Sequence, residues 1–369
     1  MRILVAPDKF KGSLGAAEVA ANIATGFREA LADAEIALLP IADGGEGTAD
    51  VICSAAGGEW HSCQVHDANS DIVSARYGTI DGGKTAVMEM SQAAGLWRVP
   101  PERRRDPERA SSFGVGEMLL DAMHRGARKI IVGLGGSATN DGGFGMARAL
   151  GFRFLDRNGT ELVGPVSDLL SLARIEAPEA LRLPQIIAAA DVRIPLLGER
   201  GATRVFGLQK GATPTQLDVL EQALRRLTEM VRSDLKTDFS SIAGAGAAGG
   251  LGFGLMTFAA AAMRSGFNVV AECIGLEEAV CGADVIITGE GRLDAQSFEG
   301  KAPGSLAQLA RRHGKRVYAI VGCVEGEQRA AQMFDAVMVL SDASTTVGNA
   351  ASTGGALRTR ARELAQRQL

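Results

Sequence analysis

Short apolar runs rich in Ile and Val recur along this chain, and most are followed by a Gly- or Asp-containing turn and a longer segment. Such runs are typical of strands, whereas apolar residues near i, i+3 and i+4 spacing in the longer segments indicate helices. This alternation predicts an α/β protein with a parallel sheet. The expected strands are 2–6, 36–40, 129–133, 152–155, 186–190, 284–288, 316–321 and 336–340, and the expected helices include 16–32, 115–124, 215–233, 302–312 and 357–367.

Residues 60–90 break this rhythm, because polar and apolar side chains alternate there without a helix between them. Strict alternation favours antiparallel strands. We therefore predict two α/β domains. The first is Rossmann-like, with a parallel sheet formed by both chain ends, residues 1–60 plus 280–369. The second, residues 61–279, is inserted between them and has a mixed sheet.

Composition excludes several classes of function. With 46% hydrophobic and 22% charged residues, the 369-residue chain has the profile of a soluble globular protein. Its net charge of -4 is not concentrated in either half, so neither nucleic acid nor an anionic membrane is an expected partner. The five cysteines form no C-x-x-C pair, which favours a reducing, cytoplasmic location. Residues 239–263 are uncharged but rich in Gly and Ala, so we expect a glycine loop and a buried helix rather than a membrane span.

Polar, glycine-rich loops follow several of the apolar runs. In open α/β sheets ligands bind beyond the carboxyl ends of the strands, and glycines beside Ser, Thr or Asn let backbone N–H groups approach an anion. The carboxylates in these loops would repel a bare polyphosphate but could hold Mg²⁺, which prefers oxygen ligands. The combination favours ATP with Mg²⁺, although each Asp alone is also typical of a helix N-cap or a turn. The loops are 7–13, 42–48, 135–143, the turn at Asp191, and 289–294.

Two other patterns indicate alternatives. Residues 78–85 match the P-loop spacing, but Asp81-Gly82-Gly83 lies between alternating runs and favours a hairpin turn. Residues 133–138 are close to a dinucleotide-binding turn, with Asp156 at the end of the next expected strand, which leaves a dinucleotide-dependent oxidoreductase open. Against it, residues 140–143 favour a turn where the helix of that motif should continue. A non-catalytic nucleotide- or metabolite-binding protein would need only the loops.

Taken together, these loops resemble the bacterial glycerate kinase family, of the glycerate 2-kinase type associated with glyoxylate and glucarate metabolism. The resemblance covers nearly the full length. It is carried by APDKFKGSL at 6–14, PIADGGEGT at 40–48, residues 135–143, FGLQKGA at 206–212, residues 244–252, TGEGRLD at 288–294, and Gly300-Lys301. It implies ATP- and Mg²⁺-dependent phosphorylation of D-glycerate, to 2-phosphoglycerate, on two α/β domains. Only small-molecule partners are implied, and a homo-oligomer is left open.

Phosphoryl transfer depends mainly on positioning and charge neutralisation, so we expect cations and backbone amides close to the phosphates. Lys11, Arg292 and Lys301 are the predicted cations, and Asp191 is the predicted base for the substrate hydroxyl. Asp43, Glu290 and Asp294 are predicted to hold Mg²⁺. Substrate or nucleotide contacts are expected, in an interdomain cleft that closes on its ligands, from Asp8, Lys9, Ser13, Gly44, Gly45, Thr48, Gly136, Ser137, Asn140, Asp141 and Gly289.

Two positions depart from the family pattern. Ile194 stands where we expect asparagine, and Leu208 stands where proline is usual. We expect these differences to reflect local repacking rather than a changed substrate.

Overall fold

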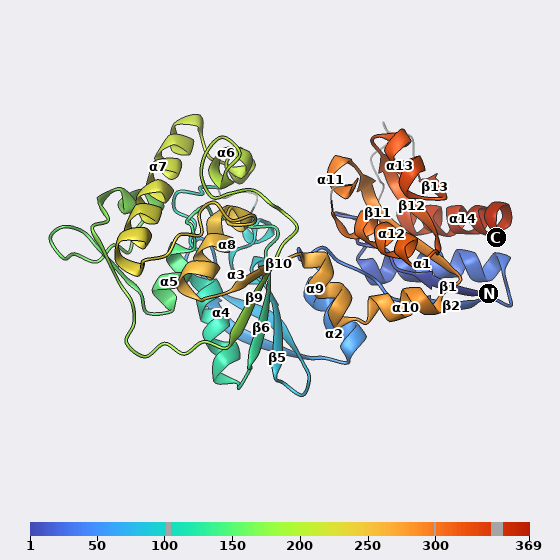
Figure 1. Cartoon of the computed structure of the whole chain (residues 1–369), viewed down its shortest axis with the longest axis horizontal. Helices are drawn as coiled ribbons and strands as arrows, with labels where there is room; N and C mark the ends of the chain where they lie inside the picture. Colours follow the sequence, from blue (N-terminus) through green and yellow to red (C-terminus); the bar gives the residue numbers. More distant parts are fainter. Residues whose placement is uncertain (101–104, 299, 341–349) are drawn as a thin grey trace. The chain divides into compact units, whose positions relative to one another are not determined.

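The computed structural model describes residues 1–100, 105–298, 300–340 and 350–369, which divide into two compact units. Unit 1 consists of Met1–Asp43, Asp50–Ala56 and Gly266–Leu369, and unit 2 of Gly44–Ala49 and Gly57–Ser265. Unit 1 is built from both chain ends, so in Figure 1 its blue N-terminal strands lie beside orange and red C-terminal ones. The α/β class, the parallel sheet from the chain ends and the inserted mixed sheet are confirmed.

Unit 1 contains a five-stranded sheet in the order β13-β12-β11-β1-β2, and every neighbouring pair is parallel. Its strands are short apolar runs because both faces are covered. Ile3 and Val5 pack on one face, whereas Leu4 and Ala6 pack on the other. The strands are β1 (Arg2–Val5), β2 (Glu35–Leu38), β11 (Val285–Leu293), β12 (Arg316–Val324) and β13 (Ala336–Val339).

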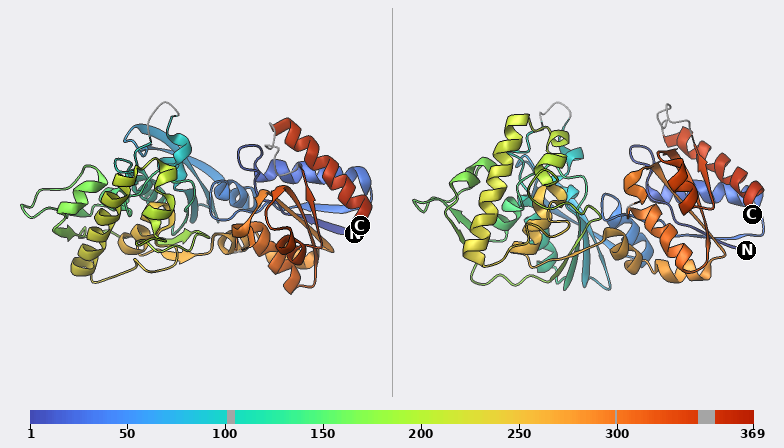
Figure 2. Two further views of the ribbon diagram at one scale, coloured as in Figure 1. Left: turned by 90° about the horizontal axis from the view of Figure 1, so that it is seen from above. Right: turned by 45° about the horizontal axis from the view of Figure 1, so that its top comes forward.

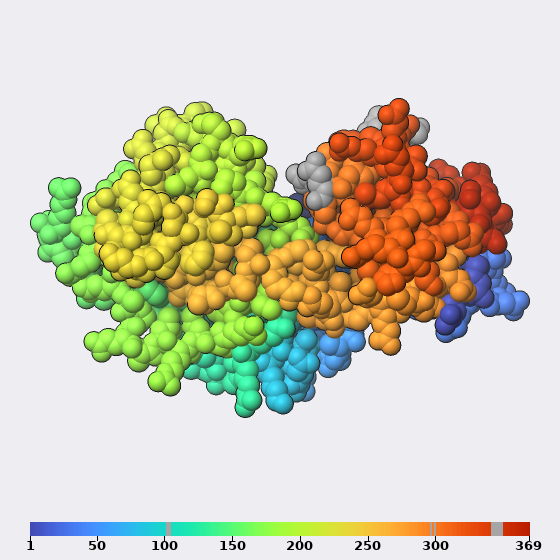
Figure 3. Space-filling view, in the orientation of Figure 1, coloured from blue at the N-terminus to red at the C-terminus, as the bar shows by residue number. Residues whose placement is uncertain are grey.

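Two helices cover the Ile3 face of this sheet, α1 (Ala16–Ala30) and α14 (Ala350–Gln368). Figure 2 shows the red α14 lying along the blue α1, and the space-filling view in Figure 3 shows the same joining of blue and red segments at the surface. The other face is covered by α9 (Gly266–Cys273), α10 (Leu276–Gly282), α12 (Ala302–Arg312) and α13 (Glu327–Met333). The short α11 (Ala295–Phe298) follows β11, and α2 spans Thr48–Ala56.

Unit 2 contains a six-stranded sheet in the order β10-β9-β6-β5-β4-β3. The first four strands are parallel to one another, and β4 is antiparallel to both β5 and β3, as predicted for residues 60–90. Asp81, Gly82 and Gly83 form the turn between β4 and β5, all with positive φ, so residues 78–85 are a hairpin and not a P-loop. The strands are β3 (Glu59–His66), β4 (Ile72–Ile80), β5 (Thr85–Glu89), β6 (Lys129–Gly133), β9 (Gln185–Ala189) and β10 (Ala262–Arg264).

The helices of unit 2 share one apolar core with its sheet. The longest, α7, begins where expected, because Thr213 and Gln216 form a reciprocal capping box and Pro214 occupies the first helical position. A π-helical turn, Val231–Leu235, extends it. The helices are α3 (Ser91–Ala94), α4 (Phe113–His124), α5 (Phe144–Ala149), α6 (Ala202–Phe206), α7 (Pro214–Met230) and α8 (Ala247–Phe258).

Two sequence predictions need correction. Residues 152–155 were expected in a parallel sheet, but β7 (Arg153–Leu155) pairs antiparallel with β8 (Arg174–Glu176) in a separate two-stranded sheet. Residues 289–293 were expected in a loop, but β11 continues through Leu293, because β12 is equally long and pairs with it along that length.

The segment 239–263 leads through a glycine loop into the buried helix α8, as predicted. Among the helices in the described ranges, none combines the length and apolar character that crossing a membrane requires.

Candidate functional site

Unit 1 has a topological switch point beside β1, because β2 lies on one side of this strand and β11 on the other. In open α/β sheets such a point, at the carboxyl ends of the strands, is the usual place for a ligand. The backbone N–H of Asp8, just after β1, donates to the carbonyl of Gly289 on β11 at 2.8 Å. Gly289 itself allows β11 and β12 to approach closely, since a Cβ there would clash with the carbonyl oxygen of Ile320. This contact brings the Asp8 loop beside Glu290.

Two buried carboxylates, Asp8 and Glu290, lie at this point, each 8% exposed. Burial, opposed by Lys9 and reinforced by the charge of Asp43, raises the pKa of Asp8 to about 7. Burial also raises the pKa of Glu290 to about 8, and the Asp8 carboxylate adds to that effect. Lys301, the N-cap residue of α12, acts in the opposite direction on both groups. Predicted site residues from four separate sequence segments therefore share one electrostatic environment.

The other predicted residues of unit 1 are arranged differently. Arg292, near the end of β11, is exposed, and its guanidinium lies 3.4 Å from the carboxylate of Glu325. Asp294 accepts hydrogen bonds through Oδ1 from the backbone and hydroxyl of Ser297, so it caps α11. Lys11 is exposed on the turn after β1, and Ser13 donates to the hydroxyl of Thr353 at 2.8 Å.

A divalent cation fits the carboxylates of this cluster. Oε1 of Glu290 is buried and, within the described part of the chain, has no hydrogen-bond partner. A cation would also offset the burial and, to a lesser extent, the repulsion between carboxylates that raise both pKa values. The described residues include no group of three or more His, Cys, Asp or Glu side chains that could hold a metal by themselves. Because Mg²⁺ commonly uses one or two carboxylates and completes its shell with waters and phosphates, these residues fit an ion that arrives with a nucleotide.

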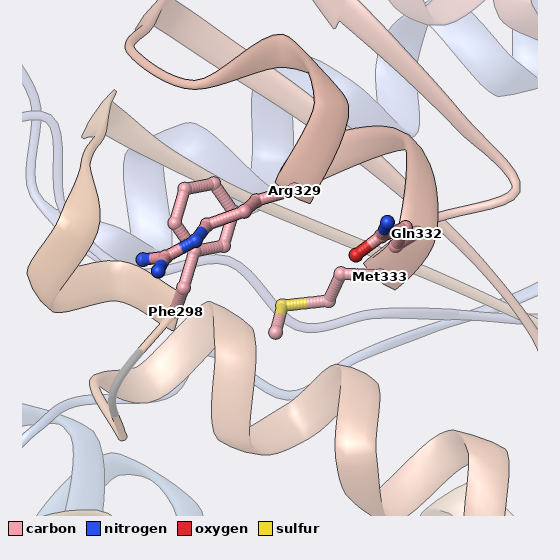
Figure 4. A pocket seen from close by; sticks show the side chains of 4 residues that line it. All are labelled: Phe298, Arg329, Gln332 and Met333. Atoms are coloured by element: carbon pink, nitrogen blue, oxygen red, sulfur yellow. The ribbon is translucent and has the colours of Figure 1, made fainter.

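Unit 1 also contains a pocket of about 340 Å³, lined by Phe298, Arg329, Gln332 and Met333 (Figure 4). Its first lining residue, Phe298, follows Glu290 and Asp294 in the sequence. Phe298 is the last residue of α11, and the other three lining residues belong to α13. The pocket combines an aromatic ring and a thioether with one guanidinium and one amide. Such a mixture suits a flat heteroaromatic group that also carries polar edges.

In unit 2, two glycine-rich turns that are distant in the sequence pack against each other. A Cβ on Gly133 would meet the carbonyl oxygen of Gly44 at 2.6 Å, and a Cβ on Gly135 would meet Cα of Gly45 at the same distance. Only glycine permits this approach of two backbones. The predicted residues Gly44, Gly45 and the exposed Gly136 are thus brought to one edge of the sheet, beyond the carboxyl ends of β5 and β6.

Asp141 was expected to contact a ligand, but its carboxylate is 1% exposed and organises the protein interior. It accepts hydrogen bonds from the backbone and hydroxyl of Ser112 and from the backbone N–H groups of Gly143 and Gly145. Gly143, with φ of 79°, is the N-cap of α5. Asp141 therefore fixes the start of α5, which is the alternative that its turn-like sequence also allowed.

Lys210, from the FGLQKGA stretch, was not among the predicted site residues. Its ammonium group is 2% exposed and donates to the hydroxyl of Ser137 and the carbonyl of Thr139, both at 2.7 Å. Burial lowers its pKa to about 7, opposed by the charge of Asp141. Asn140, which follows Thr139 in the sequence, is 0% exposed and donates to the hydroxyl of Thr203, while its Oδ1 has no partner among the described residues. The loop after β6 is thus held by a buried cation.

Glu89 is a second functional candidate that we did not predict. It ends β5 and accepts hydrogen bonds from the backbone N–H groups of Gly47 and Ala49, which fixes the turn before α2. Thr48, the first residue of α2, is fully buried, and its hydroxyl has no partner in the described ranges. The rule that polar residues follow strand ends would have found Glu89. No local signal distinguishes Lys210 from an exposed lysine.

Asp191 follows β9, the strand next to β6, so it lies at the same sheet edge as the loop that starts at Leu134. It is partly buried and accepts a hydrogen bond from the Ser265 hydroxyl at 2.8 Å. Of the two departures, Ile194 packs against Gly246, and Leu208 is 61% exposed.

The dinucleotide-binding alternative loses its geometric support. Residues 134–143 form a long non-helical loop after β6, with positive φ at Gly136, Gly142 and Gly143. Asp156 follows β7, which is not a neighbour of β6, and it accepts backbone hydrogen bonds from Asn158 and Thr160 in a local turn. A ribose-binding acid would instead end the adjacent strand of the same sheet.

Comparison with known proteins identifies the family. The model of the glycerate kinase family matches residues 3–368. The chain is 42% identical over 327 residues to a glycerate kinase of Haemophilus influenzae, covering 88% of this chain and 86% of that protein. It is 42% identical over 325 residues to glycerate 2-kinase of Escherichia coli, covering 87% and 85%. A crystal structure assigned as glycerate kinase 2 from Salmonella typhimurium LT2 matches with a TM-score of 0.86 and 40% identity, over 99% of this chain and 97% of that one. The chain therefore belongs to the glycerate kinase family and is a phosphotransferase, as its motifs predicted.

Proposed function

We propose that this enzyme, acting in the cytoplasm, transfers the γ-phosphoryl group of ATP to the 2-hydroxyl of D-glycerate, which yields 2-phosphoglycerate and ADP. The family membership supports the class of reaction, and the name of the Escherichia coli relative supports the position of transfer. The observation that carries the proposal is the buried pair of Asp8 and Glu290 at the switch point of unit 1. Two carboxylates with raised pKa values at a ligand-binding edge are suited to receive a cation with bound phosphates.

In this proposal, different charged residues of unit 1 neutralise the phosphates of ATP in different ways. Glu290, with Asp8 and Asp43 in the same electrostatic environment, would hold Mg²⁺, and Asp294 remains a further predicted ligand. The ion, when bound, would withdraw charge from the transferring phosphoryl group. Lys301 lies at the N-terminus of α12, so its ammonium group and the positive end of the helix dipole both favour phosphate oxygens. Arg292, which faces Glu325, has the weakest support among the predicted cations.

We propose that the adenine base binds in the pocket lined by Phe298, Arg329, Gln332 and Met333. It has the volume and the mixed chemistry that a purine needs, and α11 joins it to Asp294 in the sequence. Truncation of Phe298 to alanine should raise KM for ATP while KM for glycerate stays unchanged. Equal KM values for ATP in both proteins would remove the base from this pocket.

Asp191 remains the predicted base for the glycerate hydroxyl, because it follows an interior strand of the sheet and its partly buried carboxylate accepts a hydrogen bond from Ser265. That bond fixes the orientation of the carboxylate, which a proton acceptor needs. The glycine turns at Gly44 and Gly136, together with the Ser137 loop, offer backbone N–H groups for the acceptor's carboxylate.

The product decides the proposal. Purified enzyme is incubated with ATP, Mg²⁺ and D-glycerate, and the product is passed to enolase without a mutase, since enolase consumes only the 2-phosphate. Rapid enolase turnover is the expected result, and a requirement for added mutase would show transfer to the 3-hydroxyl. NADH binding without kinase activity would restore the oxidoreductase alternative. Binding of ATP and glycerate without turnover would indicate a sensor.

A pair of variants tests the part played by the carboxylates. Glu290→Gln keeps the size of a buried side chain but removes its charge, and we expect turnover to fall by ~10²-fold or more, which corresponds to ~2.7 kcal/mol. Glu29→Gln is the matched control in the same unit, because Glu29 is exposed and pairs with the surface guanidinium of Arg362, which has no proposed role. Equal turnover in the two variants would remove Glu290 from the phosphoryl-transfer site.

A further inference from the structure

Three side chains of unit 1, which have no role in the proposed phosphoryl transfer, contact one another in series near the start of β11. Sγ of Cys281 lies 3.3 Å from Nδ1 of His313, and Nε2 of His313 lies 2.8 Å from Oε1 of Glu277. Glu277 and Cys281 are four residues apart on α10, so they share one face of that helix, and His313 ends α12. The sequence alone offers no sign of this constellation, because His313 is 32 residues away from Cys281.

The contact with Glu277 determines which way the histidine acts. An ionised carboxylate can only accept a hydrogen bond, so Nε2 must carry the hydrogen. In the neutral ring Nδ1 then presents its lone pair to the thiol, and the S–H group donates to it. Nucleophile, base and orienting acid are therefore in contact in that order, which is the arrangement that activates a thiol towards an electrophile.

The surroundings leave this thiol reachable. Cys281 is exposed, and the side chain of His313 is 30% exposed. The negative end of the α10 dipole opposes a thiolate at this position, but Nζ of Lys315 donates to the carbonyls of Cys281 and Ala283, both at 2.8 Å, and places a cation there. The remaining charged side chain on α10 is Glu278, for which the structure records no contact with the thiol or the imidazole.

We propose that Cys281 is a reactive thiol that exchanges with low-molecular-weight disulfides of the glutathione class. In this step the thiol proton passes to Nδ1 of His313, and the Cys281 sulfur attacks one sulfur of the disulfide. The original S–S bond breaks as the mixed disulfide forms, and the departing thiolate takes the proton back from Nδ1. One disulfide and one thiol enter and one of each leaves, so no further oxidant is needed.

The location makes modification separable from catalysis. Cys281 precedes the first residue of β11, Val285, whereas Glu290 lies towards the other end of that strand. A mixed disulfide at Cys281 therefore does not need to touch the Asp8 and Glu290 carboxylates. The proposal can therefore be tested through the reactivity of the Cys281 thiol alone, whatever the substrate of the enzyme.

The test is site-resolved labelling of the folded full-length protein with iodoacetamide at pH 7, quantified by peptide mass spectrometry. The other cysteines serve as internal standards. Among them Cys63 is a slow reference, because burial and the charge of Asp121 raise its pKa to about 11. We expect Cys281 to react at least about tenfold faster than Cys63, and oxidised glutathione to place its mixed disulfide on the Cys281 peptide.

Three variants separate activation from simple exposure. His313→Gln removes the base, and Glu277→Gln removes the acceptor that fixes its tautomer, so both should slow Cys281 labelling several-fold while the Cys63 rate stays constant. Glu278→Gln, the neighbouring acid on the same helix, should leave the Cys281 rate unchanged. A labelling rate of Cys53 that stays low, because this cysteine is buried in unit 1, also shows that each variant is folded. Equal Cys281 rates in the wild type, His313→Gln and Glu277→Gln would overturn the proposal.

Discussion

The stability of this protein should depend on pH through Lys210. This lysine is 2% exposed, and its ammonium group donates to Ser137 and Thr139 without an ion-pair partner among the described residues. The neighbouring Asp141 already accepts hydrogen bonds from Ser112, Gly143 and Gly145, so it cannot pair fully with the lysine. Burial accordingly lowers the pKa of Lys210 from 10.5 to about 7.

The sign and the size of the effect follow from linkage. Between the folded pKa and the unfolded one, the unfolded chain holds a proton that the folded chain has released, so the free energy of unfolding rises with pH. Each pKa unit corresponds to ~1.4 kcal/mol. Because Lys210 is still half protonated near pH 7, its contribution should change by ~2 kcal/mol between pH 7 and pH 9.

Lys210→Met removes the charge and keeps much of the buried volume, so urea unfolding of both proteins at pH 7 and pH 9, followed by circular dichroism, isolates this contribution. The wild type should gain ~2 kcal/mol relative to the variant on going to pH 9, since the other groups cancel in the comparison. Lys84→Met, at an exposed lysine of the same unit, is the control. If the free energies of unfolding of the wild type and Lys210→Met differ by the same amount at pH 7 and pH 9, the reasoning is refuted.

Three further predictions concern unit 1 carboxylates and one glycine turn. Because burial raises the pKa of Glu290 to about 8, the wild type should lose stability as pH rises from 5 to 8. Glu290→Gln should show a smaller loss, since the buried Asp8, with its pKa raised to about 7, still contributes; thermal unfolding of both proteins across that range measures the difference. Asp294→Asn keeps a side chain able to cap α11, so the protein should fold. If Asp294 helps to hold Mg²⁺, turnover should fall by ~10²-fold and recover partly at high Mg²⁺. Normal turnover at low Mg²⁺ would show that Asp294 acts as a helix cap and not as a metal ligand. Gly143→Ala should cost several kcal/mol in urea unfolding, since its φ is 79° and a Cβ would lie 2.7 Å from Cα of Gly254, whereas Gly12→Ala, with φ of 78° and open space, should cost only ~1 kcal/mol.

The sequence by itself determined the features that depend on local pattern. Helical and strand periodicities predicted the α/β class, the antiparallel part of residues 60–90 and the hairpin at Asp81-Gly82-Gly83, because backbone periodicity and turn chemistry act over a few residues. Glycine-rich loops after strands predicted the functional edge, since the carboxyl ends of parallel strands meet there. The family followed from the same loops.

Only the tertiary structure decided which of those loop residues are buried and how burial shifts their pKa values. β11 runs through Leu293 because β12 pairs with it, and Glu290 and Arg292 then share one face of the strand, where Glu290 is buried and Arg292, nearer the end of the strand, is exposed. Residues 153–155 leave the main sheet because their partner, β8, lies twenty residues further along the chain, outside any local window. Lys210 and Asp141 are distant in sequence, and their burial depends on how the loop after β6 packs. Burial and long-range pairing set the pKa values of these groups, and neither is a property of neighbouring residues.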